Sequence, residues 1–286
     1  MCRTTISTIL LLVWWCATSF AQPVTSGPEA GTLIIIGGAA RDTVFVNTFM
    51  RMAGGPDAPI VVIPTAQEQP GGANGDLERV GDYFREHGFN QVTVRHTRDR
   101  AVADQDTFVA PIHAARGIWL TGGRQWRLVD AYAGTRTLEA MWDVLKRGGV
   151  IAGSSAGATI QGSYLARGDT RTNTIMMGDH EEGFGFITNV AIDQHTLARN
   201  RQFDIFEILE VHPHLLGMSI DENTGIVVQG NTGVVIGNSY LLMYDGTEWN
   251  DATREYEPVP IERRPFHTLR RGDVYDFAKR KVVKKR

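Results

Sequence analysis

The sequence predicts an α/β fold, with a mostly parallel β-sheet and helices on both of its faces. Short, continuously apolar segments alternate along the chain with longer segments in which apolar residues recur at helical spacing. The apolar segments lack polar alternation, which is typical of parallel strands that are buried on both faces. Regular alternation of strands with helices is typical of a layered α/β domain.

Five apolar segments are the expected strands of the parallel sheet: residues 32–36, 58–63, 91–94, 117–120 and 149–152. Residues 76–87 and 138–146 carry their apolar side chains on one helical face and are the clearest helix candidates. Residues 225–245 differ, because short apolar runs are separated there by Gly-Asn turns. They predict an antiparallel extension of the sheet near the C-terminus.

The first 21 residues have the layout of a secretory signal peptide. Arg3 supplies a positive charge, residues 9–17 are apolar, and Ser19-Phe20-Ala21 offers small residues for cleavage near Ala21-Gln22. The apolar run is much shorter than the roughly 20 residues of a membrane span. We therefore expect export to the periplasm or the medium, a short leader at residues 22–30, and a single catalytic domain at 31–286.

Composition excludes several classes of function. Both cysteines, Cys2 and Cys16, lie in the predicted signal peptide, so the mature chain has no thiol for catalysis, disulfides or metal binding. A lipid anchor on Cys16 is disfavoured, because bulky tryptophans precede it. The formal net charge of −3 provides no basic field for nucleic acid. The basic residues at 279–286 are expected to be a solvated end, with contact to an anionic surface as the alternative.

Three predicted strand ends carry residues suited to binding or chemistry: Gly37-Gly38, Gly122-Gly123 and the segment 153–157. In open α/β sheets, ligands bind beyond the carboxyl ends of the strands. The first of these ends does not match the dinucleotide fingerprint G-x-G-x-x-G, which excludes a cofactor site of that kind.

The segment Gly153-Ser154-Ser155-Ala156-Gly157 follows a predicted buried strand and precedes a segment that can be helical. G-x-S-x-G in this context is typical of a nucleophile elbow, in which a strained turn exposes the serine hydroxyl. Ser155 is therefore the candidate nucleophile. The backbone N–H groups of Ala156 and Gly123 are the candidate donors to an oxyanion.

A nucleophilic serine needs a base, and the base needs an acid to orient it. His195 ends an apolar stretch and is the best candidate base. Glu222 follows another apolar run and is the candidate acid, with Asp221 as its close competitor. His212 and His214 form an H-x-H pair, but no third metal ligand has a suitable spacing, so a surface loop is favoured.

Four groups of residues, in this order, resemble the successive motifs of cyanophycinases, which belong to a serine peptidase family that also includes aspartyl dipeptidases. The groups are Gly122-Gly123-Arg124-Gln125 with Arg127-Leu128; residues 149–158; Asp193-Gln194-His195 with Arg199 and Arg201; and Asp221-Glu222-Asn223-Thr224. The resemblance runs from about residue 31 to residue 245.

The resemblance implies a flavodoxin-like fold similar to class I glutamine amidotransferases, with serine in place of cysteine. It assigns Ser155 as nucleophile, His195 as base, Glu222 as acid, and Gly123 and Ala156 as the oxyanion hole. It also implies a peptide substrate and no metal or cofactor, and it leaves a homodimer open. The implied pocket binds an aspartyl residue linked through its β-carboxyl group, and consists of Gln125, Asp193, Gln194, Arg199 and Arg201.

Two residues depart from the family pattern. Arg124 replaces the usual Asp or Asn, and Asp204 replaces a third arginine. A helix expected over residues 199–209 would place Arg201 and Asp204 on one face, where Asp204 could divert Arg201 from the substrate or face a basic group of it. The alternative without functional consequence is that Asp204 points into solvent.

The leading hypothesis is an exported serine exopeptidase or isopeptidase that acts on β-aspartyl or acidic-residue peptides. The negative charge of Asp204 argues against cyanophycin as the preferred substrate. The alternatives are a true cyanophycinase that releases β-Asp-Arg dipeptides, an α-aspartyl dipeptidase, and a binding protein on a catalytically dead scaffold.

Overall fold

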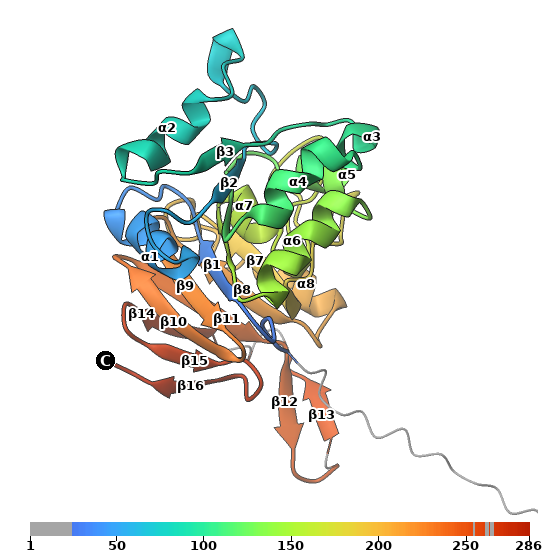
Figure 1. The fold of residues 1–286 in the computed structure, drawn as a ribbon. Coiled ribbons are helices and arrows are strands. Elements are labelled where there is room, and N and C mark those ends of the chain that lie inside the picture. The colour runs from blue at the N-terminus through green and yellow to red at the C-terminus, as the bar shows by residue number, and fades with distance from the viewer. Residues whose placement is uncertain (1–24, 254, 261–262, 264–265) are drawn as a thin grey trace, which may run out of the picture.

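The computed structural model describes residues 25–253, 255–260, 263 and 266–286 (Figure 1). The predicted signal peptide, with both cysteines, lies outside the described residues, as do the first three residues of the predicted leader.

The centre of the fold is a nine-stranded sheet with the order β16-β15-β10-β9-β1-β5-β4-β2-β3. The five strands from β1 to β3 in this order run parallel. They are β1 (Thr32–Ile36), β5 (Val150–Ser154), β4 (Gly117–Leu120), β2 (Ile60–Ile63) and β3 (Val92–Val94). Each corresponds to one of the apolar segments expected as a parallel strand, which confirms the predicted fold class.

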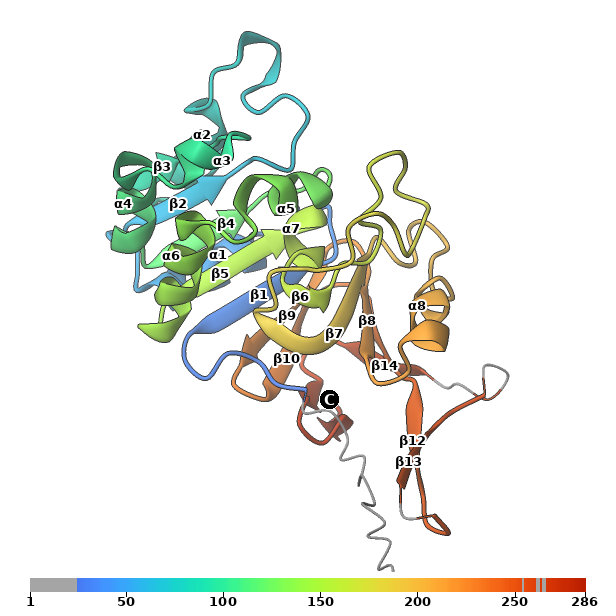
Figure 2. The ribbon, with the colours of Figure 1, turned by 90° about the vertical axis from the view of Figure 1, so that its right-hand side faces the viewer.

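The antiparallel C-terminal extension is also present, but it is divided between two sheets. Strands β9 (Thr224–Gln229), β10 (Thr232–Gly237), β15 (Val274–Asp276) and β16 (Lys281–Lys284) widen the main sheet beyond β1. A second sheet has the order β14-β11-β8-β7-β6 (Figure 2) and is mixed, because β6, β7 and β8 pair in parallel, whereas β8 with β11 and β11 with β14 pair antiparallel. Its strands are β6 (Gly162–Tyr164), β7 (Ile187–Gln194), β8 (Leu216–Ile220), β11 (Tyr240–Asp245) and β14 (Phe266–Arg270).

Helices cover both faces of the main sheet, because alternate side chains of its strands point to opposite sides. Ile34 and Ile36 of β1 pack in one apolar cluster with α1 and α2. Leu33 and Ile35 pack on the other face with α4, α5, α6 and residues of the second sheet. The helices are α1 (Thr43–Ala53), α2 (Arg79–Glu86), α3 (Arg100–Ala103), α4 (Asp106–Ala114), α5 (Trp126–Tyr132), α6 (Arg136–Lys146), α7 (Ala156–Thr159) and α8 (Ile205–Val211).

Two smaller features project from the body in Figure 1. The connection from β2 to α2, which includes the 3₁₀ turn η1 (Gly72–Asn74), rises above it, and the hairpin of β12 (Thr247–Asn250) and β13 (Glu255–Pro258) extends below it. None of the helices within the described residues is long and apolar enough to cross a membrane.

One expectation about secondary structure is wrong, and the expected exposure of the basic residues at 279–286 fails at Arg280. The helix expected over residues 199–209 begins only at Ile205, and residues 199–204 form turns with Asn200 at a φ of 55°. The basic C-terminal residues are not simply a solvated end. Arg280 is only 7% exposed, and its guanidinium donates to Asp245, Thr25 and the carbonyl of His214.

Candidate active site

Ser155 lies in a sharp turn between β5 and α7, in a backbone conformation that few residues other than glycine adopt. Its φ is 56° and its ψ is −114°. The flanking glycines make the turn feasible, because a Cβ on Gly153 would lie 2.0 Å from the carbonyl oxygen of Gly157. The Ser155 amide donates to the carbonyl of Ile36 at 2.9 Å, which fixes the turn against the end of β1.

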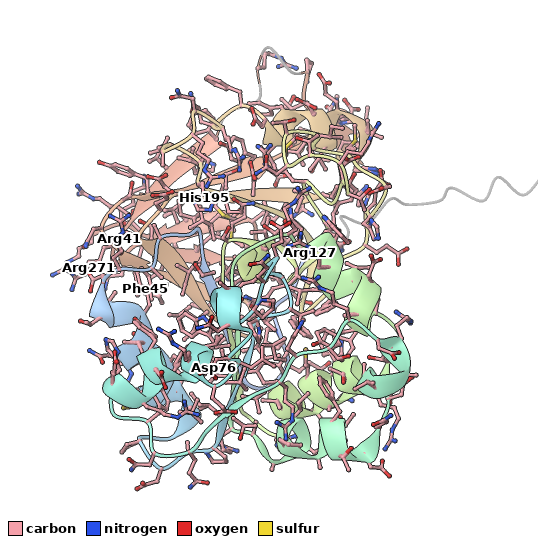
Figure 3. The ribbon with its side chains drawn as sticks, turned by 90° about the horizontal axis from the view of Figure 1, so that it is seen from above. Arg41, Phe45, Asp76, Arg127, His195 and Arg271 are labelled. Atoms are coloured by element: carbon pink, nitrogen blue, oxygen red, sulfur yellow. The ribbon has the colours of Figure 1, made fainter. Side chains whose placement is uncertain are left out.

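Ser155, His195 and Glu222 form one chain of hydrogen bonds. The Oγ of Ser155 lies 2.8 Å from Nε2 of His195, and Nδ1 of His195 lies 2.7 Å from Oε1 of Glu222. Ser155 follows β5 of the main sheet, His195 follows β7 of the second sheet, and Glu222 lies in the connection between β8 and β9. Residues from both sheets are thus brought together where the strands end; Figure 3 labels His195 in the view from above.

Glu222, and not its competitor Asp221, contacts the histidine. Oδ1 of Asp221 accepts hydrogen bonds from the amides of Leu197 and Ala198, both at 2.9 Å, and Oδ2 accepts one from Ser239 at 2.6 Å. Asp221 therefore holds the turn that follows His195.

Gly37 and Gly38, at the end of β1, support the base and the acid together. The carbonyl of Gly37 accepts from the amide of His195 at 2.9 Å, and that of Gly38 accepts from the amide of Asn223 at 2.8 Å. The imidazole lies directly on Gly38, because a Cβ built there would be 2.2 Å from Cε1 of His195. The glycine pair singled out in the sequence thus provides room for the histidine.

The two candidate oxyanion donors flank Ser155 as expected from the strand ends. A Cβ on Gly122 would lie 3.3 Å from Cβ of Ser155, which places the Gly122-Gly123 turn beside the serine. Gly123 has a φ of 143° and packs on the carbonyl of Ala66, where no side chain fits. Within the described residues, no group accepts a hydrogen bond from the amides of Gly123 or Ala156, so both are available to a ligand.

Burial lowers the pKa of His195 from its ordinary value of 6.5, because it disfavours the imidazolium. The contact with Glu222 acts in the opposite direction, whereas the charges of Arg199 and Arg201 lower the pKa further. The imidazole is therefore neutral near pH 7, which is the form that can accept a proton from Ser155.

This shift predicts the pH dependence of hydrolysis. Because a general base must be unprotonated, kcat/KM should rise with pH as His195 loses its proton, and then level off. The midpoint of this acid limb should lie below the ordinary histidine pKa of 6.5. A profile of kcat/KM at constant ionic strength measures it, and a midpoint at or above 6.5 would contradict the role given to burial.

Two of the predicted pocket residues do not face solvent. Gln125 is 1% exposed, and its Nε2 donates to the carbonyls of Ala166 and Arg167 at 2.7 and 2.9 Å. Asp193 is fully buried, and both of its carboxylate oxygens accept from Arg167. In this structure both side chains therefore lie in the protein interior and do not line a surface open to solvent.

Of the other three predicted pocket residues, Gln194 and Arg201 are buried, at 5% and 7% exposed, and Arg199 is exposed. Nη1 of Arg201 donates to the carbonyl and the side-chain oxygen of Gln194, at 3.2 and 3.3 Å. Arg199 is exposed, and its guanidinium has no hydrogen-bond or ion-pair partner within the described part of the chain. Both arginines lie near enough to His195 to influence its pKa.

Asp204 does not pair with Arg201, which was one of the outcomes left open by the sequence. Oδ2 of Asp204 instead accepts from Nη2 of Arg167 at 2.6 Å. The reason is the broken helix, because residues 199–204 are turns and do not place the two side chains on a common helical face. Sequence reasoning missed Arg167 altogether, since its partners are 26 and 37 residues away and no local spacing indicates them.

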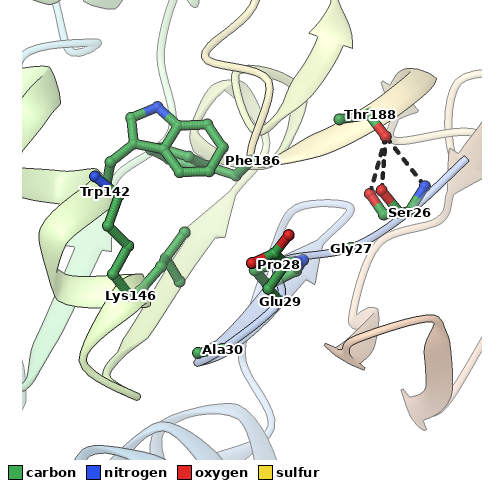
Figure 4. Close-up of a pocket in the computed structure, with 10 residues that line it drawn as sticks. Ser26, Gly27, Pro28, Glu29, Ala30, Trp142, Lys146, Phe186 and Thr188 are labelled. Atoms are coloured by element: carbon green, nitrogen blue, oxygen red, sulfur yellow. Dashed lines mark hydrogen bonds between the residues drawn. The ribbon is translucent and has the colours of Figure 1, made fainter.

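A cavity of about 520 Å³ lies far from Ser155. It is bounded by residues 26–30, the end of α6 with Trp142 and Lys146, and the start of β7 (Figure 4). These elements meet at the amino end of β1, whereas Ser155 follows the carboxyl end of β5. The cavity is therefore separate from the candidate active site.

A sheet of this topology, with serine, histidine and glutamate joined in that chain order, has the arrangement of a serine hydrolase distinct from the α/β-hydrolases, whose order is serine, acid, histidine. The model of peptidase family S51 matches residues 33–236, and the chain belongs to this family of serine-type peptidases.

Curated relatives are similar over most of their length. The chain is 30% identical over 264 residues to the cyanophycinase of Nostoc sp., which covers 88% of each chain. It is 31% identical over 266 residues to the cyanophycinase of Thermosynechococcus vestitus, covering 89% of this chain and 82% of the relative.

Solved structures support the fold. A peptidase from an acI-B1 actinobacterium superposes with a TM-score of 0.61 at 20% identity, covering 87% of this chain and 98% of that one. A putative peptidase E protein from Listeria monocytogenes has a TM-score of 0.52 at 17% identity, covering 73% of this chain and 99% of that one.

Proposed function

We propose that the chain is an exported serine exopeptidase or isopeptidase that hydrolyses β-aspartyl or acidic-residue peptides with a Ser155-His195-Glu222 triad. The observation that carries the proposal is the continuous hydrogen-bond chain, with 2.8 Å from serine to histidine and 2.7 Å from histidine to glutamate. Export rests on the signal-peptide layout of the first 21 residues.

In the proposed acylation step, Oγ of Ser155 attacks the scissile carbonyl carbon while Nε2 of His195 takes the hydroxyl proton. Glu222 accepts the hydrogen bond of Nδ1–H and stabilises the imidazolium that forms. The amides of Gly123 and Ala156 bind the negative oxygen of the tetrahedral intermediate. When the intermediate collapses, the C–N bond breaks and His195 gives its proton to the leaving amine.

Water then attacks the acyl-enzyme. His195 takes a proton from the water as its oxygen bonds to the acyl carbon. The second intermediate collapses, the ester bond to Ser155 breaks, and the proton returns to Oγ. The products are a carboxylic acid, which then loses its proton to the solvent or to the amine, and an amine, and the enzyme is regenerated.

Arg199 and Arg201 are the proposed determinants of acidic substrates. A guanidinium group binds a carboxylate with paired, charge-assisted hydrogen bonds. Arg199 is suited to this role because it is exposed and its guanidinium is unpaired among the described residues, beside the reacting histidine.

Cyanophycin is a second candidate substrate, favoured by one observation. The charge of Asp204, which argued against cyanophycin, is paired with Arg167 and does not face the site as a free anion. The repulsion expected from the sequence is therefore largely removed, and the curated relatives named as cyanophycinases support the same candidate.

A panel of α- and β-linked aspartyl dipeptides, neutral dipeptides and cyanophycin, assayed for released amine, tests the proposal. We expect cleavage of β-aspartyl peptides. Turnover of neutral dipeptides alone would contradict the acidic specificity, and turnover of α-aspartyl peptides alone would indicate an aspartyl dipeptidase.

Replacing Arg199 with glutamine should raise KM for acidic peptides by roughly tenfold to a hundredfold, since a hydrogen bond to a charged group contributes about 1.5–3 kcal/mol. The fold should be unchanged, because the side chain is exposed. Arg51→Gln, an exposed arginine on α1, is the matched control and should leave KM unaltered. An unchanged KM in Arg199→Gln would remove Arg199 from the pocket.

A further inference from the structure

Arg167 is a buried charge that none of the proposed catalytic steps uses. Its side chain is 2% exposed, and its backbone has a φ of 57°, in the left-handed region that residues with a side chain rarely adopt. A buried cation in a strained backbone persists only when its surroundings hold it firmly. Its contacts should therefore indicate what it does.

All three nitrogens of the guanidinium are bound. Nε and Nη2 donate to the two oxygens of Asp193, at 2.7 and 2.9 Å, in a bidentate pair. Nη2 also donates to Asp204 at 2.6 Å, and Nη1 donates to the carbonyl of Asn173 at 3.0 Å. Two carboxylates thus compensate one cation, and a loop carbonyl satisfies the remaining donor.

The contact between Arg167 and Asp193 connects Arg167 to His195, the proposed base. Oδ1 of Asp193, which Arg167 holds, also accepts from the backbone amide of Gln194 at 2.8 Å. Gln194 ends β7 and is followed by His195. Arg167 therefore fixes the strand end from which the imidazole reaches Ser155.

The contact with Asp204 leads to the arginines of the pocket. The amide of Asp204 donates to the carbonyl of Arg201 at 3.1 Å, so the anchored aspartate closes the turn that carries Arg201. Arg201 in turn binds Gln194. A third contact involves residues 122–125, which include the candidate oxyanion donor Gly123. Nε2 of Gln125 donates to the carbonyl of Arg167.

We propose that Arg167 is a positioning residue that holds three parts of the site in fixed relative positions. They are His195, the turn that carries Arg201, and residues 122–125 with the candidate oxyanion donor Gly123. Through Asp193 it sets the position of His195, and through Asp204 it sets the position of Arg201. This inference rests on the proposed function for the identity of the reaction. It also gives the acid at position 204 a role, because Asp204 accepts a hydrogen bond from Nη2 of Arg167 in addition to the pair with Asp193.

The test compares Arg167→Met, Arg167→Lys and Asp204→Asn with the wild type. The readouts are kcat and KM on a β-aspartyl dipeptide, the rate of labelling of Ser155 by a fluorophosphonate, and the melting temperature. The labelling rate reports the activated serine without a peptide. It therefore tests Arg167 even if the wild type cleaves none of the expected peptides, which would overturn only the proposed function.

We expect Arg167→Met to lower kcat and the labelling rate by roughly 10²-fold, the effect of a displacement of about 1 Å at a reacting group. Arg167→Lys keeps the charge but loses the bidentate geometry, so it should recover only part of this loss. Asp204→Asn should raise KM severalfold while kcat stays within about twofold, because Asp204 acts on the turn of Arg201 and not on His195.

Arg280→Met is the matched control. Arg280 is also a buried arginine with a positive φ, 46°, and it is paired with a carboxylate, Asp245, away from the triad. It should lower the melting temperature and leave kcat, KM and labelling of the folded protein unchanged.

The proposal is overturned if Arg167→Met and Arg167→Lys lower the melting temperature as Arg280→Met does but retain wild-type kcat, KM and labelling. If Arg167→Met does not fold, Arg167→Lys and Asp204→Asn test the proposal in its place. Wild-type kinetics in both Arg167→Lys and Asp204→Asn would then exclude a positioning role.

Discussion

Replacing Ser155 with alanine should abolish peptide hydrolysis and leave the protein folded. Alanine removes the only oxygen that His195 activates, and it adopts the strained backbone of the elbow no less readily than serine does. The remaining acceleration over water should be about 10³–10⁴-fold, from the oxyanion donors and substrate binding alone. Amine release and the melting temperature, measured on the same preparation, check both parts of this expectation.

His195→Ala should cost nearly as much as Ser155→Ala, and the double variant little more than either, because the two residues act as a unit. Additive losses would count against a triad. A Ser154→Ala variant provides the matched control for the elbow. If it were inactive and Ser155→Ala active, the nucleophile would be assigned to the wrong serine.

Gly38→Ala should cost roughly 10²–10⁴-fold in kcat, the usual contribution of a general base. The added Cβ would lie 2.2 Å from Cε1 of His195, so the imidazole must leave its position between Ser155 and Glu222. The measurement is kcat on the preferred peptide together with the fluorophosphonate labelling rate, and both should fall.

Gly54→Ala separates displacement of the imidazole from backbone strain. Gly54 has a φ of 109° and nothing within 4 Å of the position of a Cβ, so alanine there introduces strain without a collision. It should lower stability slightly and leave kcat unchanged. Equal losses of kcat in the two variants would show that the effect of Gly38→Ala is not local to His195.

The parallel sheet was predictable because each of its strands corresponds to one short, continuous segment of the sequence. Five apolar runs, each ended by glycine or proline or followed by a turn, correspond to β1 to β5 with boundaries that differ by at most two residues. The elbow was predictable for the same reason, since G-x-S-x-G between a strand and a helix is a local pattern. The assignment of Ser155 as nucleophile and His195 as base stays a prediction that the variants above test, and the assignment of Glu222 as acid likewise stays a prediction.

The pocket was less predictable because it is built from long-range pairs. The amphipathic pattern over residues 199–209 predicted a helix, but Asp221 holds the amides of Leu197 and Ala198, and Asn200 takes a left-handed conformation. These tertiary contacts delay the helix to Ile205. The partners of Arg167 follow from the same arrangement, which no spacing in the sequence reveals.

Ser155, His195 and Glu222 are positioned by two different sheets. This arrangement affects the stage of folding at which the proposed site is complete. Ser155 belongs to the main sheet, whereas His195 extends from the second one, and Glu222 lies in the strand connection that passes between them. Contacts between residues far apart in sequence form late in folding, because closing long loops is slow. A chain in which only the parallel strands β1 to β5 have assembled therefore has Ser155 but no histidine beside it. Under the proposed function, hydrolysis therefore requires the second sheet to be in place, because His195 follows its strand β7.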